Sequence, residues 1–256
     1  MAAIPVVHND PQVRTMIRRA LPRRGVRLVS SRTVDKAHSV LMQELVDAIV
    51  VDVRASTLDG AIELAQKFPN IPMFAFSRFR PDDGNLIATC FKRGFRGVLV
   101  QGVDDGAIGE ILVSLSASRS RRESLSDAPR LLRLTEVMQL RAWNEVLDRV
   151  GQGTTTNDVA KSLGCSREYI SREFAAGGAP NLKRVIDLVR AVWAADLLRN
   201  PGYNVRSVSE VLGFSSPSHL AGCARRVAGV APSELVQLGP KGILTQFRRG
   251  RTRSRL

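Results

Sequence analysis

One short pattern occurs twice in the chain, as Val159-Ala160-Lys161-Ser162-Leu163-Gly164-Cys165-Ser166 and as Val208-Ser209-Glu210-Val211-Leu212-Gly213-Phe214-Ser215-Ser216. Each copy has a helix with periodic apolar residues that ends at Leu-Gly, then a tight turn and a serine able to cap another helix. Glycine suits the turn because it adopts backbone conformations that other residues reach only at a cost. The doubled pattern predicts two helix-turn-helix units within residues 154–238.

Capping residues and a connecting helix support both units. Thr155 lies three residues before Asp158, the spacing of a capping box, and Asn204 can cap the first helix of the second unit. One long helix over residues 181–200 is expected to join the units rigidly. Its apolar side comprises Leu182, Val185, Ile186, Val189, Val192, Trp193 and Leu197. The alternative is an ordinary helical bundle whose Leu-Gly turns merely join core helices, but the doubled pattern, the connector and a basic surface coincide here.

Residues 154–238 resemble the DNA-binding domain of the AraC/XylS family of bacterial transcription regulators. The resemblance rests on Ala160, Leu163-Gly164, Ser166, Ile170-Ser171-Arg172, Phe174, Arg190, Leu197-Leu198, Gly213-Phe214-Ser215-Ser216, Gly229-Val230 and Pro232-Ser233-Glu234. It implies an all-α C-terminal domain and a sequence-specific, DNA-binding transcriptional regulator.

Charge is distributed unevenly along the chain. Residues 1–118 hold 15 basic and 12 acidic side chains, a net charge of +3, whereas the remaining residues hold 23 and 12, a net charge of +11. A basic field on the helix-turn-helix half favours a polyanionic partner, since neutralised phosphates release their counterions. Double-stranded DNA is therefore the expected partner.

Composition excludes several other classes. The 256 residues suffice for one or two domains, and no apolar run approaches the roughly 18 residues of a membrane span. The N-terminus lacks the features of a signal peptide, and Cys90, Cys165 and Cys223 are scattered without metal-ligand or disulfide spacing. We find no phosphate-binding loop, metal cluster or nucleophile–base pair. We expect a cytoplasmic protein that is not an enzyme and has no catalytic residue, metal or cofactor.

Residues 3–118 alternate short apolar runs with amphipathic stretches. The runs lie at 4–7, 26–29, 48–53, 72–76 and 98–100, and the stretches at 11–23, 34–45, 58–68, 84–93 and 104–118. Five strands that alternate with helices predict a doubly wound, five-stranded parallel sheet, an α/β fold of the flavodoxin-like kind. Its functional edge is expected at the carboxyl ends of the strands, where His8, Asn9, Asp10, Asp52, Ser77 and Gln101 lie.

This segment also resembles the receiver domain of bacterial response regulators. The resemblance rests on residues 6–11, 49–53, 72–77 and 94–101. It places Asp52 at the phosphoacceptor position and Ser77 at the position that senses the phosphoryl group. Receivers, however, hold Mg²⁺ through an acidic pair where this chain has His8 and Asn9, and Asp10 stands one place beyond.

Two further positions depart from the receiver pattern. Gln101 replaces a lysine that pairs with the phosphoryl oxygens, and Val98 replaces an aromatic switch residue. Little then remains to offset charge on a phosphoryl group. We therefore expect a receiver-like domain that controls the protein without phosphorylation, through dimerisation or ligand binding. Phosphorylation of Asp52 is the alternative.

The second helix of each unit is expected to enter the major groove of DNA. In the first unit this helix covers residues 166–175, with Ile170 and Phe174 facing inward. The outward residues Arg167, Glu168, Ser171 and Arg172 are then candidate DNA contacts. An arginine can bond bidentately to a guanine edge, and a glutamate can accept from a cytosine amino group.

The second unit offers fewer long polar side chains. Its helix, residues 216–227, presents Pro217, Ser218, His219, Ala221 and Gly222, and the family's usual arginine and core phenylalanine are replaced by Gly222 and Ala224. This helix is expected to touch mainly phosphates, through Ser216, Ser218, Arg225 and Arg226, or to recognise DNA shape. Non-specific architectural DNA binding is accordingly a further alternative.

The expected domains are 1–118, receiver-like; 119–130, an exposed linker; 131–240, the tandem helix-turn-helix domain; and 241–256, a basic tail. Residues 131–150 are expected to form a helix. The tail carries Lys241, Arg248, Arg249, Arg251, Arg253 and Arg255, and either binds phosphates or is merely solubilising. RNA polymerase and a second copy of the chain are further expected partners, and no membrane contact is expected.

Overall fold

The computed structural model describes residues 2–22, 25–54, 57–175 and 178–253, with side chains described as far as residue 250. The chain forms two compact units. Unit 1 comprises Met1–Ser120 with Asn200–Tyr203, and unit 2 comprises Arg121–Arg199 with Asn204–Leu256. Each unit is described by itself below.

Unit 1 alternates strands and helices as its sequence predicts. The elements are β1 (Ala2–Val7), α1 (Pro11–Ala20), β2 (Val26–Ser31), α2 (Val34–Gln43), β3 (Ile49–Val51), α3 (Leu58–Lys67), β4 (Met73–Ser77), α4 (Gly84–Lys92), β5 (Gly97–Val100) and α5 (Ile108–Ser114). The strands form one parallel sheet in the order β2-β1-β3-β4-β5, which is the flavodoxin-like order. The predicted α/β fold is confirmed.

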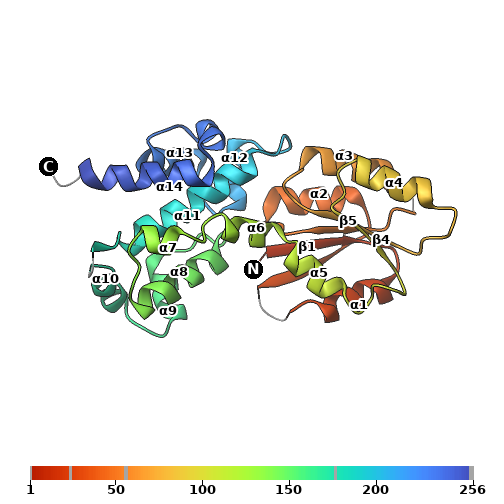
Figure 1. Cartoon of the computed structure of the whole chain (residues 1–256), viewed down its shortest axis with the longest axis horizontal. Coiled ribbons are helices and arrows are strands. Elements are labelled where there is room, and N and C mark those ends of the chain that lie inside the picture. The colour runs from red at the N-terminus through yellow and green to blue at the C-terminus, as the bar shows by residue number, and fades with distance from the viewer. Residues whose placement is uncertain (1, 23–24, 55–56, 176–177, 254–256) are drawn as a thin grey trace. The chain divides into compact units, whose positions relative to one another are not determined.

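Helices cover both faces of this sheet (Figure 1). Strands β1, β3 and β4 are buried along their whole length, which explains their continuous apolar sequences. On one face, Val13 and Ile17 of α1 and Ile108 and Leu112 of α5 pack against the sheet. Gly109 allows α5 to approach α1, because a Cβ there would lie 2.0 Å from the carbonyl oxygen of Ala20.

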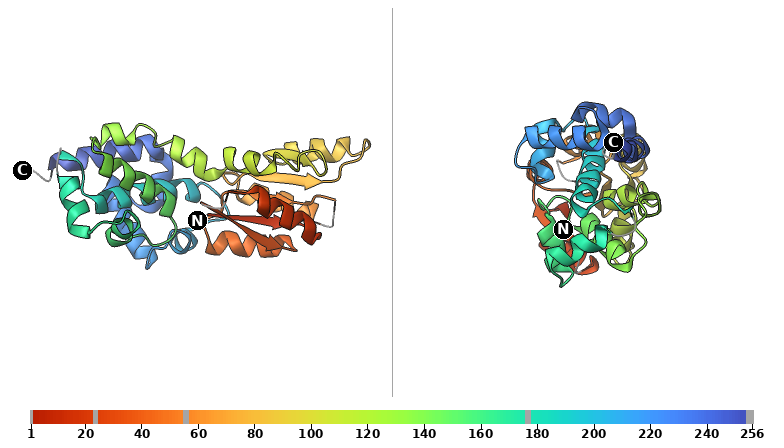
Figure 2. Two further views of the ribbon diagram at one scale, coloured as in Figure 1. Left: turned by 90° about the horizontal axis from the view of Figure 1, so that it is seen from below. Right: turned by 90° about the vertical axis from the view of Figure 1, so that its left-hand side faces the viewer.

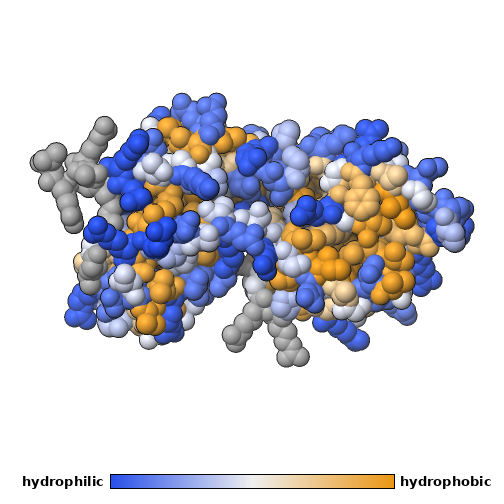
Figure 3. Space-filling model, viewed as in Figure 1, coloured by the Kyte–Doolittle hydropathy of each residue, from blue (hydrophilic) through white to orange (hydrophobic). Residues whose placement is uncertain are grey.

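Part of the surface of unit 1 is apolar. Phe91 on α4 is 55% exposed and Val103, after β5, is 78% exposed. Figure 3 shows apolar surface over the part of unit 1 where Figure 1 places α4, β5 and α5.

Unit 2 is helical. It comprises α6 (Ala117–Glu123, which begins in unit 1), α7 (Ala128–Leu131), α8 (Val137–Arg149), α9 (Thr156–Ser162), α10 (Arg167–Ala175), α11 (Leu182–Leu198), α12 (Val205–Val211), α13 (Pro217–Ala228), the 3-10 turn η2 (Pro232–Glu234) and α14 (Leu235–Arg253). The connector α11 is confirmed, and Asn181 caps it by accepting from the N–H of Arg184 at 2.9 Å. Most of α11 is buried, because α8, α12, α13 and α14 surround it (Figures 1 and 2).

The segment expected to be an exposed linker is largely helical. The boundary between the units, after Ser120, falls within the predicted range 119–130, but α6 and α7 occupy most of that range. Leu125, Ala128 and Leu132 are buried, at spacings of one helical turn. The sequence did not indicate these buried turns, because the three apolar residues are sparse among serines and arginines, although their period is helical.

The segment expected to be a basic tail is helical in its described part. Residues 241–253 continue α14 beyond a kink at Gly239, whose φ is 60°. Ile243, Leu244 and Phe247 are buried, and the guanidinium of Arg184 lies 4.7 Å from the centre of the Phe247 ring. This apolar face anchors the segment, while Lys241, Arg248 and Arg249 stay exposed. The side chains of Arg251 and Arg253, and all of Arg255, lie outside the described residues.

No helix in the described part of the chain combines the length and apolar character needed to cross a bilayer.

Candidate nucleic-acid interface and sheet-edge pocket

The first helix-turn-helix unit has the predicted caps and turn. The hydroxyl of Thr155 accepts from the N–H of Asp158 at 3.3 Å, and the carboxylate of Asp158 accepts from the N–H of Thr155 at 2.9 Å. The Thr155 donors stabilise the carboxylate and lower the pKa of Asp158. The turn passes through Gly164 at φ +68°, and the hydroxyl of Ser166 accepts from the N–H of Tyr169 to cap α10.

Helix α10 divides into a buried and an exposed face. Ile170 and Phe174 are fully buried against the rest of unit 2. The four residues predicted to face outward are all exposed: Arg167, Glu168, Ser171 and Arg172. Hydrogen bonding from its own backbone N–H, and from Ser166, lowers the pKa of Glu168, so this side chain is an anionic acceptor at neutral pH.

The second unit is capped in the same way. Asn204 accepts from the N–H of Ser207 at 2.9 Å, and the Ser207 hydroxyl accepts from the N–H of Asn204 at 2.9 Å. After the turn, the hydroxyl of Ser216 accepts from the N–H of His219 at 3.1 Å and caps α13, where Pro217 occupies the first position. Both predicted helix-turn-helix units are therefore present.

The side chains on the outer face of α13 are short and mostly uncharged. Pro217, Ser218 and His219 are exposed, and Ser216, Ala221 and Gly222 are half-buried. The ring of His219 is held, since its Nδ1 lies 3.1 Å from the Ser215 hydroxyl and the ring stands edge-on to Phe214. Arg225 and Arg226 are exposed at the far end of the helix, and Arg226 pairs with Asp187 at 3.3 Å.

Two contacts fix the second turn. Arg190 of α11 stacks its guanidinium 3.6 Å from the centre of the Phe214 ring and donates to the carbonyl of Leu212 at 3.1 Å. Burial lowers the pKa of Arg190, which nevertheless stays a cation at neutral pH. Gly213, at φ +64°, lies against the segment before α9. A Cβ added at Gly213 would stand 2.5 Å from the backbone nitrogen of Gly153. Within unit 2, the two helix-turn-helix units are thus joined by this backbone contact as well as by α11.

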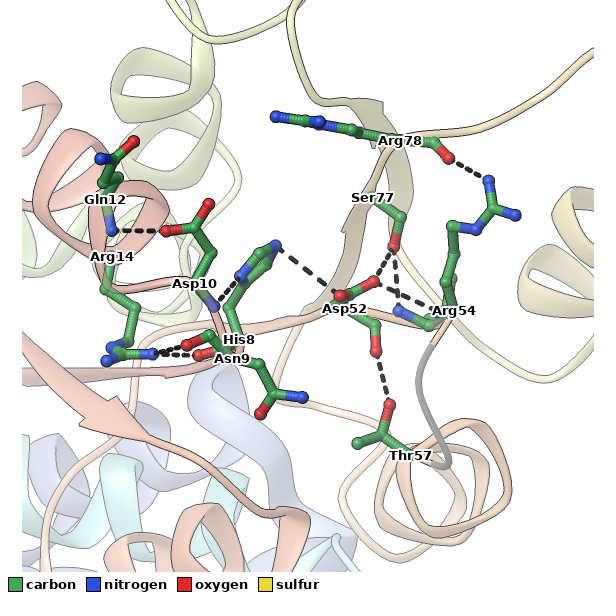
Figure 4. A network of polar contacts seen from close by, with 11 residues as sticks. His8, Asn9, Asp10, Gln12, Arg14, Asp52, Arg54, Thr57, Ser77 and Arg78 are labelled. Carbon is green, nitrogen blue, oxygen red and sulfur yellow. Dashed lines mark hydrogen bonds and ion pairs between the residues drawn. The ribbon is translucent and has the colours of Figure 1, made fainter.

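A pocket of about 470 Å³ opens at the carboxyl edge of the sheet in unit 1. It is lined by His8, Asp10, Asp52, Arg54, Arg78, Phe79, Arg80 and Gln101. Asp52 accepts from the Ser77 hydroxyl at 2.6 Å and from the N–H of Arg54 at 3.2 Å (Figure 4). The Nε2 atom of His8 lies 3.7 Å from the other oxygen of Asp52.

His8 is a buried imidazole in this pocket. Burial lowers the pKa of His8, although the carboxylates of Asp52 and Asp10 act in the opposite direction. Its Nδ1 accepts from the N–H of Asp10 at 3.1 Å, so the neutral ring carries its proton on Nε2. The carboxylate of Asp10 caps α1, accepting from the N–H of Gln12 at 2.7 Å.

Comparisons with known proteins match the helix-turn-helix residues of unit 2. A family model for a helix-turn-helix domain matches residues 159–237. An uncharacterised HTH-type transcriptional regulator of Mycobacterium tuberculosis is 35% identical over 85 residues, which are 33% of this chain and 24% of that protein. The Msm operon regulatory protein of Streptococcus mutans is 30% identical over 84 residues, 33% of this chain and 30% of that protein. Unit 2 carries an AraC-type helix-turn-helix domain.

These alignments span less than a third of each relative. Among solved structures, a response regulator from Thermotoga maritima has a TM-score of 0.41 at 19% identity, covering 45% of this chain and 97% of that one. Full-length FixJ from B. japonicum has a TM-score of 0.38 at 15% identity, covering 90% and 98%.

Sequence reasoning missed several residues of both surfaces. In the AraC-type domain, Tyr169 is 39% exposed beside Glu168 on α10, and only its helical position could have indicated this. In the pocket, Arg54, Arg78, Phe79 and Arg80 were missed. They follow the ends of β3 and β4 by one to three residues, so the topology places them at the same edge as Asp52. Asn9, expected at this edge, does not line the pocket.

Proposed function

We propose that this protein is a sequence-specific DNA-binding transcriptional regulator. The observation that carries the proposal is helix α10 of the AraC-type domain, which is capped, anchored by Ile170 and Phe174, and exposes four polar side chains. Arg167, Glu168, Ser171 and Arg172 supply donors and an acceptor of the kinds that discriminate base edges in the major groove. Helix α13 docks beside it through Ser216, Ser218, Arg225 and Arg226, mainly on phosphates.

Unit 1 controls this activity without phosphorylation of Asp52. His8 occupies one of the two positions where a receiver holds its metal. Its Nδ1 already accepts a hydrogen bond, and burial lowers its pKa. The next carboxylate, Asp10, is engaged as the cap of α1. Asp52 itself accepts a hydrogen bond from the Ser77 hydroxyl, and Gln101 offers no positive charge. This donor set is poor for Mg²⁺, which prefers several carboxylate and water oxygens.

Control then acts through a bound ligand or a second copy of the chain. The exposed apolar side chains of Phe91 and Val103 support self-association of unit 1. RNA polymerase is a further proposed partner, and a cytoplasmic location follows from a function on DNA.

Selection of bound sites from random duplex DNA tests the proposal. We expect enrichment of one defined sequence, and at least about 10³-fold preference for it over random DNA. The short polar face of α13 favours a second candidate, a non-specific architectural protein, which predicts equal affinity for all sequences. Incubation with acetyl phosphate and Mg²⁺ tests the mode of control, and a stable acyl-phosphate on Asp52 would contradict it.

A further inference from the structure

Charged side chains of both signs line the sheet-edge pocket. Three arginines and two aspartates line it. Arg54 is already occupied, because it pairs with Asp83 at 3.0 Å and donates to the carbonyl of Arg78. The two carboxylates are also occupied, Asp52 by Ser77 and the N–H of Arg54, and Asp10 by the N–H of Gln12. Each carboxylate therefore accepts at least one hydrogen bond and keeps its negative charge.

Arg78 and Arg80 are lining arginines without an ion pair among the described residues. Both are exposed, and no acidic side chain lies within ion-pair distance of either in the described part of the chain. In Figure 4, the side chain of Arg78 extends from the end of β4 toward the side where His8 lies. Its charge reaches that ring, since it contributes to the lowered pKa of His8. Two free guanidinium groups thus border a concave space of about 470 Å³.

We infer that this pocket binds a small oxyanion, a molecule that bears a phosphate or carboxylate group. Arg78 and Arg80 bind the anionic group, since guanidinium groups match such oxygens bidentately. The amide of Gln101 and the Nε2–H of His8 add uncharged donors, and Phe79 provides an apolar wall for the rest of the ligand. Binding is reversible and forms no bond to Asp52, whose carboxylate opposes the anion.

This inference deepens the proposed function by naming the class of ligand that unit 1 senses. It differs from phosphorylation in the sign of one effect. An anion held beside Asp52 is repelled by that carboxylate, so removal of the negative charge of Asp52 should tighten anion binding. A phosphoryl group carried by Asp52 instead needs that carboxylate.

Isothermal titration of the full chain, without DNA and with a chelator in place of Mg²⁺, tests the site. Inorganic phosphate and citrate are the probes, and the tighter of the two identifies a phosphate or a carboxylate ligand. We expect saturable binding to the wild type and at least about tenfold weaker binding to the Arg78→Ala/Arg80→Ala variant. Arg93→Ala removes an exposed arginine outside the pocket and should bind as the wild type does.

Asp52→Asn supplies the second arm, with several-fold tighter binding expected. The inference is overturned if neither probe binds, if Arg78→Ala/Arg80→Ala binds like the wild type, or if Asp52→Asn abolishes binding. DNA affinity is measured separately without the anion, and the Arg78→Ala/Arg80→Ala variant should retain it. Failure of the wild type to select a DNA sequence would contradict the proposed function and leave anion binding to its own result.

Discussion

Arg172 is the residue on which base discrimination should depend most directly. It lies on the exposed face of α10, opposite the buried Ile170 and Phe174. Arg172→Ala should weaken specific binding by ~1–3 kcal/mol and relax the preference at one base pair. Fluorescence anisotropy with the selected site and with single-base variants measures both effects. Arg96→Ala, with the same charge change in unit 1, should alter neither. Equal weakening on every sequence would make Arg172 a phosphate contact only.

Gly213 and Gly164 occupy matching turns in different surroundings. Both have positive φ, which costs other residues about 1–2 kcal/mol. A Cβ at Gly164 meets nothing within 4 Å, whereas at Gly213 it would stand 2.5 Å from the backbone nitrogen of Gly153. Gly213→Ala should therefore lower the free energy of unfolding of unit 2 by about 1–3 kcal/mol more than Gly164→Ala does. Urea denaturation of both variants measures this, and equal losses would show that the close approach is unimportant.

His8 should make the stability of unit 1 depend on pH. An unfolded histidine titrates near about 6.5, and burial lowers the pKa of His8 in the folded state. Between these two values the unfolded chain binds a proton that the folded chain does not, so the free energy of unfolding falls as pH falls. Above about pH 7 both states are neutral and the effect vanishes.

His8→Gln should remove this contribution, which is at most ~1.4 kcal/mol per pH unit below about pH 6.5. Denaturation of the wild type and the variant between about pH 5 and 7.5 measures the slope, with His38→Gln as the control. An unchanged slope in His8→Gln would show that the burial of this ring does not govern the pH dependence.

At the scale of elements, the sequence predicted those segments whose period, caps and length agree. The parallel strands and α9 to α13 were predicted because apolar spacing and capping residues indicate the same boundaries. Helices α6 and α7 and the end of α14 were missed, because their few apolar residues stand among serines and arginines. Composition indicated a linker and a tail there, whereas Leu125, Leu132 and Phe247 are buried, and Phe247 packs against Arg184 of the distant helix α11.

In helix α14, the residues up to Phe247 should contribute to stability, and the basic residues after Phe247 should contribute to DNA affinity. Phe247 is 1% exposed, so Phe247→Ala should cost about 3–5 kcal/mol of the unfolding free energy. A chain that ends after Phe247 keeps the buried face and loses the basic residues that follow. It should unfold at nearly the wild-type temperature but bind every DNA sequence more weakly, with a shallower salt dependence. Unchanged salt dependence would assign those arginines to solubility.

At the scale of the whole molecule, topology explains what sequence could and could not predict about the sites. Asp52 and His8 were found because each stands directly at the end of a strand. Arg78 and Arg80 lie in the loop after β4, where nothing in the local pattern indicates direction, and only the fold brings them to the pocket. In unit 2 the exposed face of α10 was predicted, since helical period alone separates Ile170 and Phe174 from their neighbours.

The two helix-turn-helix units should contribute unequally to sequence recognition. Helix α10 offers long polar side chains, whereas α13 presents Pro217, Ser218 and a tethered His219, and Gly222 has no side chain. Both can dock, because α11 and the contact between Gly153 and Gly213 fix them within unit 2. The binding motif should show one sharp half-site and, roughly 10 base pairs away, a weaker and A·T-biased one. Gly222→Arg should sharpen the weak half, since only the flexible end of Arg226 lies near the added Cβ, at 3.2 Å. Position weight matrices for both proteins measure this, and two equally informative half-sites in the wild type would refute it.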